Sequence, residues 1–178
     1  DPHPVVVIGH KALLVKKELG SSPIYGEQKE MLGTGHAVLE AKEACSDAEH
    51  VVVLQGDQPF TTAETIKKMI DKHLTSQAKI RVGTTTLPDF LDWRKAFVSF
   101  GRILRKDQKM YAIKEYKDAN EEERNITEVN AGIYAFDAAW LWPSLQKIGN
   151  ANAQKEYYLT SVIEIAAKDK EKIETISM

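Results

Sequence analysis

A carboxylate at the end of a short apolar run is the first candidate for chemistry in this sequence. Residues 51–54 (VVVL) are followed by Gln55, Gly56 and Asp57. Four aliphatic residues without a polar alternate predict a strand buried on both faces, as in the middle of a parallel sheet. Open α/β sheets bind ligands at the carboxyl ends of their strands, so Asp57, freed by a glycine turn, is well placed to hold a cation. For the Gly-Asp pair alone, an Asx-type turn before a helix is the alternative.

A glycine-rich loop comes one predicted helix earlier. Gly33, Thr34 and Gly35 stand directly before an apolar periodic run that reaches Cys45, which describes a tight loop feeding the amino terminus of a helix. Such a loop lets a ligand touch backbone amides without a Cβ in the way. One helix plus one strand separate it from Asp57, as in a βαβ unit. An ordinary turn with a helix cap is the alternative for this motif alone.

Two later segments carry polar groups suited to binding. Residues 126–136 predict a long strand interrupted at Gly132, where a glycine indicates a bulge or a close ligand. Asn130 offers both a donor and an acceptor beside it. Residues 150–160 are polar, contain two tyrosines and precede a predicted helix, and we interpret them as a candidate sugar-contacting edge.

The elements that position these residues read as one α/β domain over residues 1–178, without internal repeats or linkers. The pattern predicts strands over residues 4–8 and 79–86, paired strands over 101–104 and 110–115, helices over 12–19, 62–74, 140–145 and 162–166, and a helical turn over 120–124. Residues 87–100 are rich in aromatic residues and predict either a lid or a packed insertion. Since a doubly wound domain reaches such a first strand only after an earlier strand and helix, we expect the true amino-terminal end to be missing.

Length and composition restrict the class of protein. The chain has 178 residues, with 24 Lys and Arg, 26 Asp and Glu, and a single cysteine, which suits one α/β domain with a sizeable core. The nearly balanced charge argues against a general nucleic-acid or membrane surface. Cys45 is expected to be a small core residue, and a lone cysteine rules out an internal disulfide. No apolar run reaches the ~20 residues that cross a bilayer and no signal peptide opens the chain, so we expect a cytoplasmic protein.

Taken in order, the motifs resemble one family: VVVIGH, EMLGTGHAV, GDQPF, GRI, IKEYKDANEEER, EVNAGIY and NAQKEYYLT. They are similar to the uridylyltransferase domain of the bacterial bifunctional N-acetylglucosamine-1-phosphate uridylyltransferase / glucosamine-1-phosphate acetyltransferase, over residues 4–167. The resemblance implies a Rossmann-like nucleotidyltransferase fold, a three-layer sandwich with a mostly parallel sheet, here lacking its first strand. It also implies transfer of a uridylyl group from UTP to N-acetylglucosamine 1-phosphate, releasing pyrophosphate and making UDP-N-acetylglucosamine for cell-wall sugars.

The resemblance assigns roles to particular residues. Asp57 would be the catalytic residue and the ligand of Mg²⁺, the expected cofactor. Nucleotide binding is implied for Gly33, Thr34, Gln55 and Gly56. Binding of the sugar phosphate is implied for Gly101, Glu115, Asn130, Tyr158 and Thr160. Phosphoryl-type transfer needs mostly positioning and charge neutralisation from the protein, so a nucleophilic side chain is not required.

Several positions depart from the family pattern. Met31 stands where a glutamine reads the uracil edge, Gln55 replaces a tyrosine, and Lys155 and Ser161 replace a glycine and an aspartate beside the sugar pocket. The resemblance therefore leaves base and sugar specificity open.

The chain as given also lacks the family's amino-terminal glycine-rich loop, the asparagine that is the second metal ligand, and the acetyltransferase β-helix domain. We expect this piece alone to bind nucleotide in the millimolar range or weaker, about −4 kcal/mol, and to be inactive. We also expect it to associate through an exposed strand edge, and we leave a homo-oligomer open.

Three functions therefore compete. The first is a piece of the UTP-dependent uridylyltransferase. The second is a nucleotidyltransferase of the same fold that acts on another sugar 1-phosphate, alcohol phosphate or base. The third is a non-catalytic binding domain that kept the fold.

Overall fold

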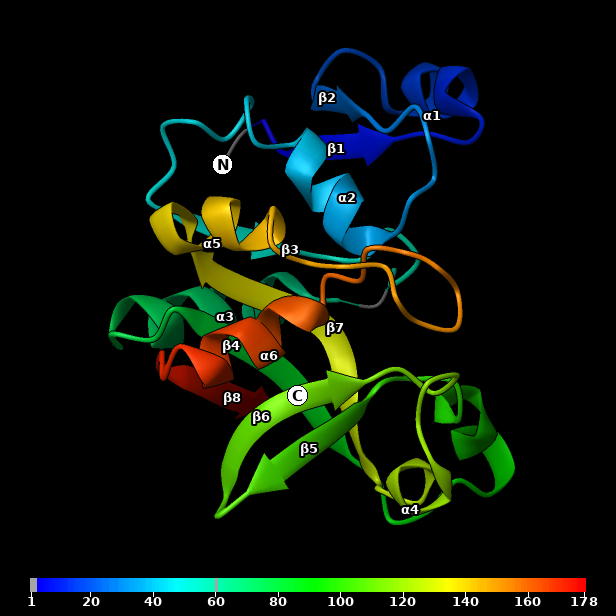
Figure 1. The fold of residues 1–178 in the computed structure, drawn as a ribbon. Coiled ribbons are helices and arrows are strands. Elements are labelled where there is room, and N and C mark those ends of the chain that lie inside the picture. The colour runs from blue at the N-terminus through cyan, green and yellow to red at the C-terminus, as the bar shows by residue number, and fades with distance from the viewer. Residues whose placement is uncertain (1–2, 60) are drawn as a thin grey trace.

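The computed structural model describes residues 3–59 and 61–178, and its largest element is a mixed six-stranded sheet (Figure 1). Five strands follow the order β6-β5-β7-β4-β8, and β3 pairs with the carboxyl end of β7. The bounds are β3 His50–Val53, β4 Ile80–Thr86, β5 Arg102–Lys106, β6 Lys109–Lys114, β7 Glu128–Asp137 and β8 Ile173–Ser177. β7 organises the sheet, because it is hydrogen-bonded to β3, β4 and β5.

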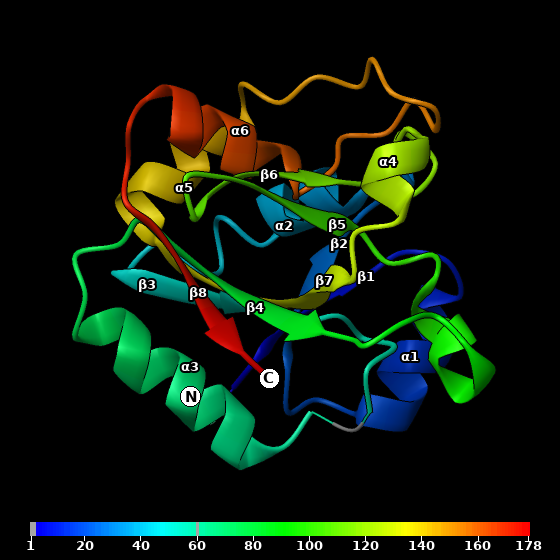
Figure 2. The same cartoon turned by 90° about the horizontal axis from the view of Figure 1, so that it is seen from below.

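Helices cover both faces of this sheet (Figure 2). α3 (Ala63–Leu74) lies on one face, where Met69 is fully buried in an apolar cluster. α2 (Thr34–Glu40), α5 (Ala138–Leu145) and α6 (Ser161–Lys168) contribute to the core on the other face. The predicted three-layer α/β arrangement is therefore confirmed.

The strand directions qualify the expectation of a mostly parallel sheet. β3, β4, β5 and β8 point in one direction, and β7 and β6 point in the other. Because β7 runs back between β3 and β4, it is antiparallel to every neighbour described for it. Most strands thus point in the same direction, as expected. Most neighbouring strands are nevertheless paired antiparallel, and β4–β8 is the parallel pair among the described strands of this sheet.

The expectation that residues 51–54 lie in the middle of a parallel sheet is wrong. Among the described residues, β3 pairs with β7 alone, in antiparallel register, and its three valines are partly exposed. The unbroken apolar run has a different cause. Val52 packs against the cluster under α3, whereas Val51 and Val53 pack against the larger core on the opposite face. Both faces are apolar, although one edge of the strand is open.

A second sheet has two parallel strands, β1 (Val5–Ile8) and β2 (Ile24–Glu27), joined by α1 (Ala12–Leu19). The first strand and the helix confirm the sequence predictions, and Gly20 closes the helix with a φ of 69°. No residue of α1 is buried, and Leu13 and Leu14 are exposed. The sequence analysis predicted neither β2 nor β8.

Local sequence signals are confirmed at several element ends. The Thr62 side chain accepts a hydrogen bond from the Thr65 amide at 3.1 Å and caps α3. Asn120 begins α4 (Glu121–Arg124) with a capping box, so the acidic patch is a capped helical turn. The β5–β6 hairpin also forms as predicted. α2 ends at Glu40, earlier than expected, and turns continue through Cys45, whose thiol pKa is raised by burial. None of the helices in the described ranges is long and apolar enough to cross a membrane.

Residues 87–100 form an insertion of exposed and partly exposed residues in which Leu87 is the buried one, and the alternatives of a lid and a packed insertion stay open. A 3₁₀ helix, η1 (Asp92–Phe97), lies within it. The fully buried guanidinium of Arg102 donates to the backbone oxygens of Val98, Phe100 and Arg124 and lies 4.5 Å from the centroid of the Phe90 ring. A buried cation held by three carbonyls joins the insertion to α4 and to the start of β5.

His73, on α3, is a buried titratable group away from the segments that carry the candidate site. Its side chain is 2% exposed, and within the described chain neither ring nitrogen makes a hydrogen bond of ordinary geometry. The His50 ring lies edge-on, with the ring centroids 5.0 Å apart. Burial lowers the pKa of His73, and the nearby His50 and Arg81 lower it further, opposed by smaller effects of Asp137 and the Phe136 backbone.

We expect His73 to make stability depend on pH. Because the folded-state pKa lies below the unfolded value of about 6.5, the unfolded chain binds the proton first, and stability is lost as pH falls through that value. The free energy of unfolding, measured in urea between pH 7.5 and 5, should fall less steeply in His73→Phe than in the wild type, by up to about 1.4 kcal/mol per pH unit. Equal slopes would contradict this assignment.

Candidate active site

The turn that carries Asp57 follows β3 and is open to solvent. Asp57 is exposed, and a Cβ placed on Gly56 would meet no atom within 4 Å. The turn is closed by the Gln58 amide, which donates to the Gln55 carbonyl at 3.3 Å. Among the described residues, the Asp57 carboxylate makes no hydrogen bond or ion pair of ordinary geometry that a cation would have to displace.

A bulge in β7 lies against this turn. Between the pairs Val82–Tyr134 and Thr84–Asn130, residues 131–133 face Gly83 alone, so β7 carries extra residues there. Gly132 has a φ of 72°, and a Cβ on it would lie 2.7 Å from Gln58 Nε2 and 3.0 Å from Gln55 Cγ. The predicted bulge is therefore present, and it requires glycine for both reasons. It places Asn130 on the same feature that supports the Asp57 turn.

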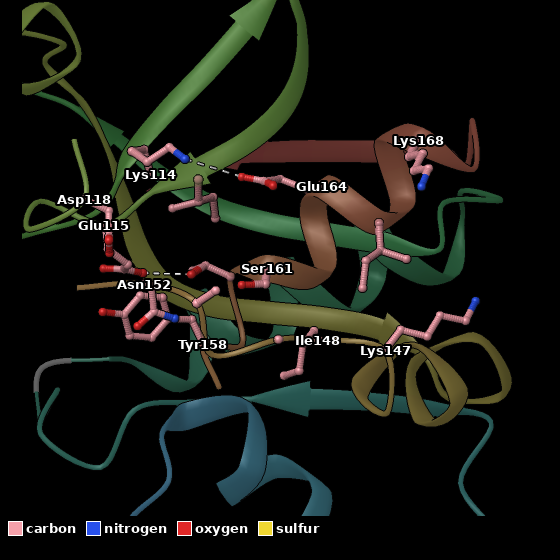
Figure 3. A pocket seen from close by; sticks show the side chains of 15 residues that line it. Lys114, Glu115, Asp118, Lys147, Ile148, Asn152, Tyr158, Ser161, Glu164 and Lys168 are labelled. Carbon is pink, nitrogen blue, oxygen red and sulfur yellow. Dashed lines mark hydrogen bonds and ion pairs between the residues drawn. The ribbon is translucent and has the colours of Figure 1, made fainter. Parts of the chain in front are cut away.

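Expected sugar-binding residues from three other segments are linked in series to Asn130, which itself contacts Gly101. The Thr160 hydroxyl donates to Glu115 Oε1 at 2.8 Å, a contact drawn in Figure 3. A Cβ on Gly101 would lie 3.5 Å from both carboxylate oxygens of Glu115. The Gly101 carbonyl accepts the Asn130 amide at 2.9 Å. Burial raises the pKa of Glu115, and the hydrogen bond from Thr160 opposes this shift.

Glu115, Tyr158 and Thr160 also line a cavity of about 490 Å³ between β6, α6 and the loop after α5. Figure 3 shows Glu115, Asp118 and Tyr158 together at one end of it and Lys147 and Lys168 at the other. The Tyr158 side chain is 7% exposed, and within the described chain its hydroxyl makes no hydrogen bond of ordinary geometry. Burial first, and the nearby carboxylates second, raise its pKa, opposed by the Gln154 side chain. This end of the cavity therefore offers acceptors and a hydroxyl, which suit the hydroxyl groups of a sugar.

The glycine-rich loop is hydrogen-bonded to the segment that carries Tyr158. The Tyr157 amide donates to the Leu32 carbonyl and the Gly35 amide donates to the Tyr157 carbonyl, both at 2.7 Å. The Leu159 amide donates to Thr34 Oγ1 at 2.9 Å. A Cβ on Gly33 would lie 2.7 Å from the Tyr157 carbonyl oxygen. The close backbone approach that the glycines predicted is therefore made here by the protein's own chain, and the Gly35 amide is already engaged.

Gln28, which is hydrogen-bonded to the glycine-rich loop, was not predicted from the sequence. Its side chain is 8% exposed, and Nε2 donates to the Gly33 carbonyl at 3.0 Å and lies 2.9 Å from His36 Nδ1. Asp118, which accepts the Ala153 amide at 2.8 Å and fixes the loop before Tyr158, was not predicted either. Neither residue carries a recognisable motif, because the role of Gln28 depends on how the loop at Gly33 folds back and that of Asp118 on a contact 35 residues along the chain.

The donors that could hold a metal ion are few. Within the described ranges, no group of three or more His, Cys, Asp or Glu side chains is arranged to hold one. Mg²⁺ usually keeps several waters and binds one or two carboxylates together with substrate phosphates. Asp57 is a single exposed aspartate in an open turn, and it therefore fits that kind of site.

The fold has known counterparts among nucleotidyltransferases. The structure of a UDP-glucose pyrophosphorylase complexed with UDP-glucose matches with a TM-score of 0.70 and 16% identity, over 98% of this chain and 73% of that one. A putative glucose-1-phosphate thymidylyltransferase from Bacillus anthracis matches with a TM-score of 0.69 and 18% identity, over 98% and 67%. The Rossmann-like nucleotidyltransferase fold is thereby confirmed.

Sequence relatives are closer. The bifunctional protein GlmU of Halalkalibacterium halodurans is 46% identical over 171 residues, which are 95% of this chain and 36% of that protein. The same protein of Geobacillus thermodenitrificans is 42% identical over 167 residues, 93% and 35%. The chain thus spans about a third of the length of these relatives. The family model described as "MobA-like NTP transferase domain" matches residues 2–116. These matches confirm the resemblance seen in the motifs, and the chain belongs to the MobA-like NTP transferase domain family.

Proposed function

We propose that this chain forms the sugar-binding side, and part of the nucleotide-binding side, of a site that transfers a uridylyl group from UTP to N-acetylglucosamine 1-phosphate. The products are UDP-N-acetylglucosamine and pyrophosphate. One observation carries the proposal. The cluster of Gly101, Glu115, Asn130 and Thr160 is joined through the β7 bulge to the turn that presents Asp57.

In this proposal the sugar phosphate lies over the bulge. Glu115 accepts a hydrogen bond from a sugar hydroxyl and is itself oriented by Thr160. Gly101 packs closely beside that carboxylate, because a Cβ there would lie 2.8 Å from Ile113 Cγ2 and 3.5 Å from both carboxylate oxygens. The phosphate oxygen of the sugar 1-phosphate attacks the α-phosphorus of UTP, and pyrophosphate leaves with the electrons of the broken P–O bond. Holding both substrates in line supplies much of the rate enhancement in such transfers.

Asp57 would hold Mg²⁺ in this site. A bound magnesium ion neutralises charge on the phosphates as the bond to pyrophosphate breaks. The relatives named GlmU and the pyrophosphorylase-like fold support a sugar-1-phosphate nucleotidyltransferase in general. The choice of uridine is our inference from the loop at Gly33 and Thr34. Met31 does not contribute to this choice, because its half-exposed thioether cannot read a base edge as an amide would.

We expect Asp57→Asn to lower turnover roughly 100-fold or more without unfolding the protein, because a metal ligand at a reacting phosphate is worth several kcal/mol. Pyrophosphate release should be measured in the whole protein that contains this chain, with UTP, Mg²⁺ and N-acetylglucosamine 1-phosphate. Asp107→Asn, in the exposed β5–β6 turn, is the matched control. Near-normal turnover of Asp57→Asn at saturating Mg²⁺ would refute the metal assignment, and faster turnover with another sugar 1-phosphate or another nucleotide would refute the substrate assignment.

Gly132→Ala should lower kcat by shifting the Asp57 turn at Gln55, whose Cγ would lie only 3.0 Å from the new Cβ. Gln58 Nε2, at 2.7 Å, ends a flexible side chain that can rotate away. The positive φ adds a backbone cost of about 1–2 kcal/mol. Gly20→Ala carries a similar φ, 69°, with no atom within 4 Å of its Cβ. It therefore reproduces the backbone cost without the displacement. Loss of stability in both variants with kcat unchanged in both would show that the bulge does not position the turn.

A further inference from the structure

We propose that Tyr134 is a positioning residue of this site: its buried hydroxyl sets the orientation of the Asn130 carboxamide toward the sugar phosphate. The inference rests on the proposed function, because it concerns the same sugar-binding cluster. Tyr134 is not among the residues that the motifs pointed to, since it lies inside the sheet rather than on the surface of the site.

The position of Tyr134 makes its hydroxyl expensive to bury without a partner. It lies in the middle of β7, paired with Val53 of β3 on one side and Val82 of β4 on the other. Its side chain is 2% exposed, and its ring stacks on Phe136 with the centroids 5.8 Å apart. A phenylalanine would serve the same packing. A buried hydroxyl without a hydrogen-bond partner would destabilise the fold, so we expect this hydroxyl to have a specific partner.

The hydroxyl has one hydrogen-bond partner among the described residues, and that partner is Asn130. Asn130 Nδ2 donates to the Tyr134 hydroxyl oxygen at 2.6 Å. Burial raises the pKa of Tyr134 far above its usual value, and the nearby Glu115 raises it further. The hydroxyl therefore stays protonated, and it keeps its own hydrogen to donate.

Asn130 is held at its other end as well. Its Oδ1 accepts the Gly132 amide at 3.0 Å, across the bulge. Rotating the carboxamide by 180° would place Nδ2 against the Gly132 N–H, donor against donor, so the Gly132 amide selects which end carries the oxygen. The Tyr134 hydroxyl, which can accept or donate, fixes the position of the other end and hence the plane of the carboxamide. Among the described residues, one Nδ2 hydrogen and one Oδ1 lone pair are left without a partner, and the carboxamide that carries them is fixed. Those are the groups that a sugar phosphate can use.

The same two contacts extend to the nucleotide side. Gly132 lies against Gln55 and Gln58, which belong to the turn around Asp57. An Asn130 carboxamide that lost its Tyr134 contact would also hold Gly132 less firmly. The main effect is nevertheless expected at the sugar phosphate, because Asn130 contacts the hydroxyl directly and the turn only through Gly132.

Tyr134→Phe tests the inference, because it removes the hydroxyl and keeps the ring. We expect KM for N-acetylglucosamine 1-phosphate to rise about 3- to 10-fold, as for one lost hydrogen bond, while KM for UTP changes less than about 2-fold. Tyr111→Phe, half exposed on β6, is the matched control and should behave as the wild type. A merely structural role would lower stability and leave both KM values unchanged, which would overturn the proposal.

A double-mutant cycle shows whether Tyr134 acts through Asn130. In an Asn130→Ala background, Tyr134→Phe should produce no further rise in KM for the sugar phosphate, because the group it orients is gone. Additive effects of the two substitutions would overturn the inference.

A measurement without turnover separates this inference from the proposed function. The side-chain amide protons of Asn130, observed by NMR in the labelled whole protein, should exchange more slowly in the wild type than in Tyr134→Phe. Slow exchange in the wild type together with no pyrophosphate release from any sugar 1-phosphate would sink the proposed function and leave the orienting contact standing. Equal exchange in both proteins would refute the contact itself.

Discussion

The bulge in β7 is the constraint on which the rest of the candidate site depends. A regular antiparallel strand would pair every residue of β7 and turn its side chains alternately to the two helical layers. The extra residues at 131–133 break that alternation, and Gly132 with its positive φ turns the backbone toward the Asp57 turn. Because Asn130 bonds to Gly101 by its backbone and to Gly132 by its side chain, one local irregularity joins the cluster of Gly101, Glu115 and Thr160 to the turn that presents Asp57.

A second set of contacts that holds the site together lies between the glycine-rich loop and the segment around Tyr158. Three hydrogen bonds link residues 32–35 to residues 157–159, and a fourth, from Gln28, holds the loop from the other side. The residues expected to meet a nucleotide are thus attached directly to those expected to meet a sugar. A displacement of one segment must be transmitted to the other, since the hydrogen-bond distances of 2.7–2.9 Å leave little room for independent movement.

The sequence predicted those features of the fold that depend on local chemistry. The helical turn at 120–124, the β5–β6 hairpin and the bulge at Gly132 each follow from the conformational or hydrogen-bonding needs of the residues at that point. It did not predict which strands pair. Residues 51–54 look like a central strand because both faces pack on apolar clusters, yet the antiparallel return of β7 leaves β3 with an open edge. Gln28, Asp118 and Tyr134 were missed for a related reason, since their hydrogen bonds depend on loop and bulge conformations that no motif specifies.

Two positions that depart from the family pattern, Met31 and Gln55, differ in how they contact the bulge. Met31 is half exposed and lies over Gly9, away from the bulge. Gln55 is different, because its Cγ would be 3.0 Å from a Cβ on Gly132 and its side chain therefore packs where the two halves of the site meet. A tyrosine at that position would place a rigid ring against the bulge, whereas glutamine has an unbranched side chain that adapts to it. A change at Gln55 can thus be accommodated at the bulge while Glu115, Thr160 and Asn130 keep their own hydrogen bonds.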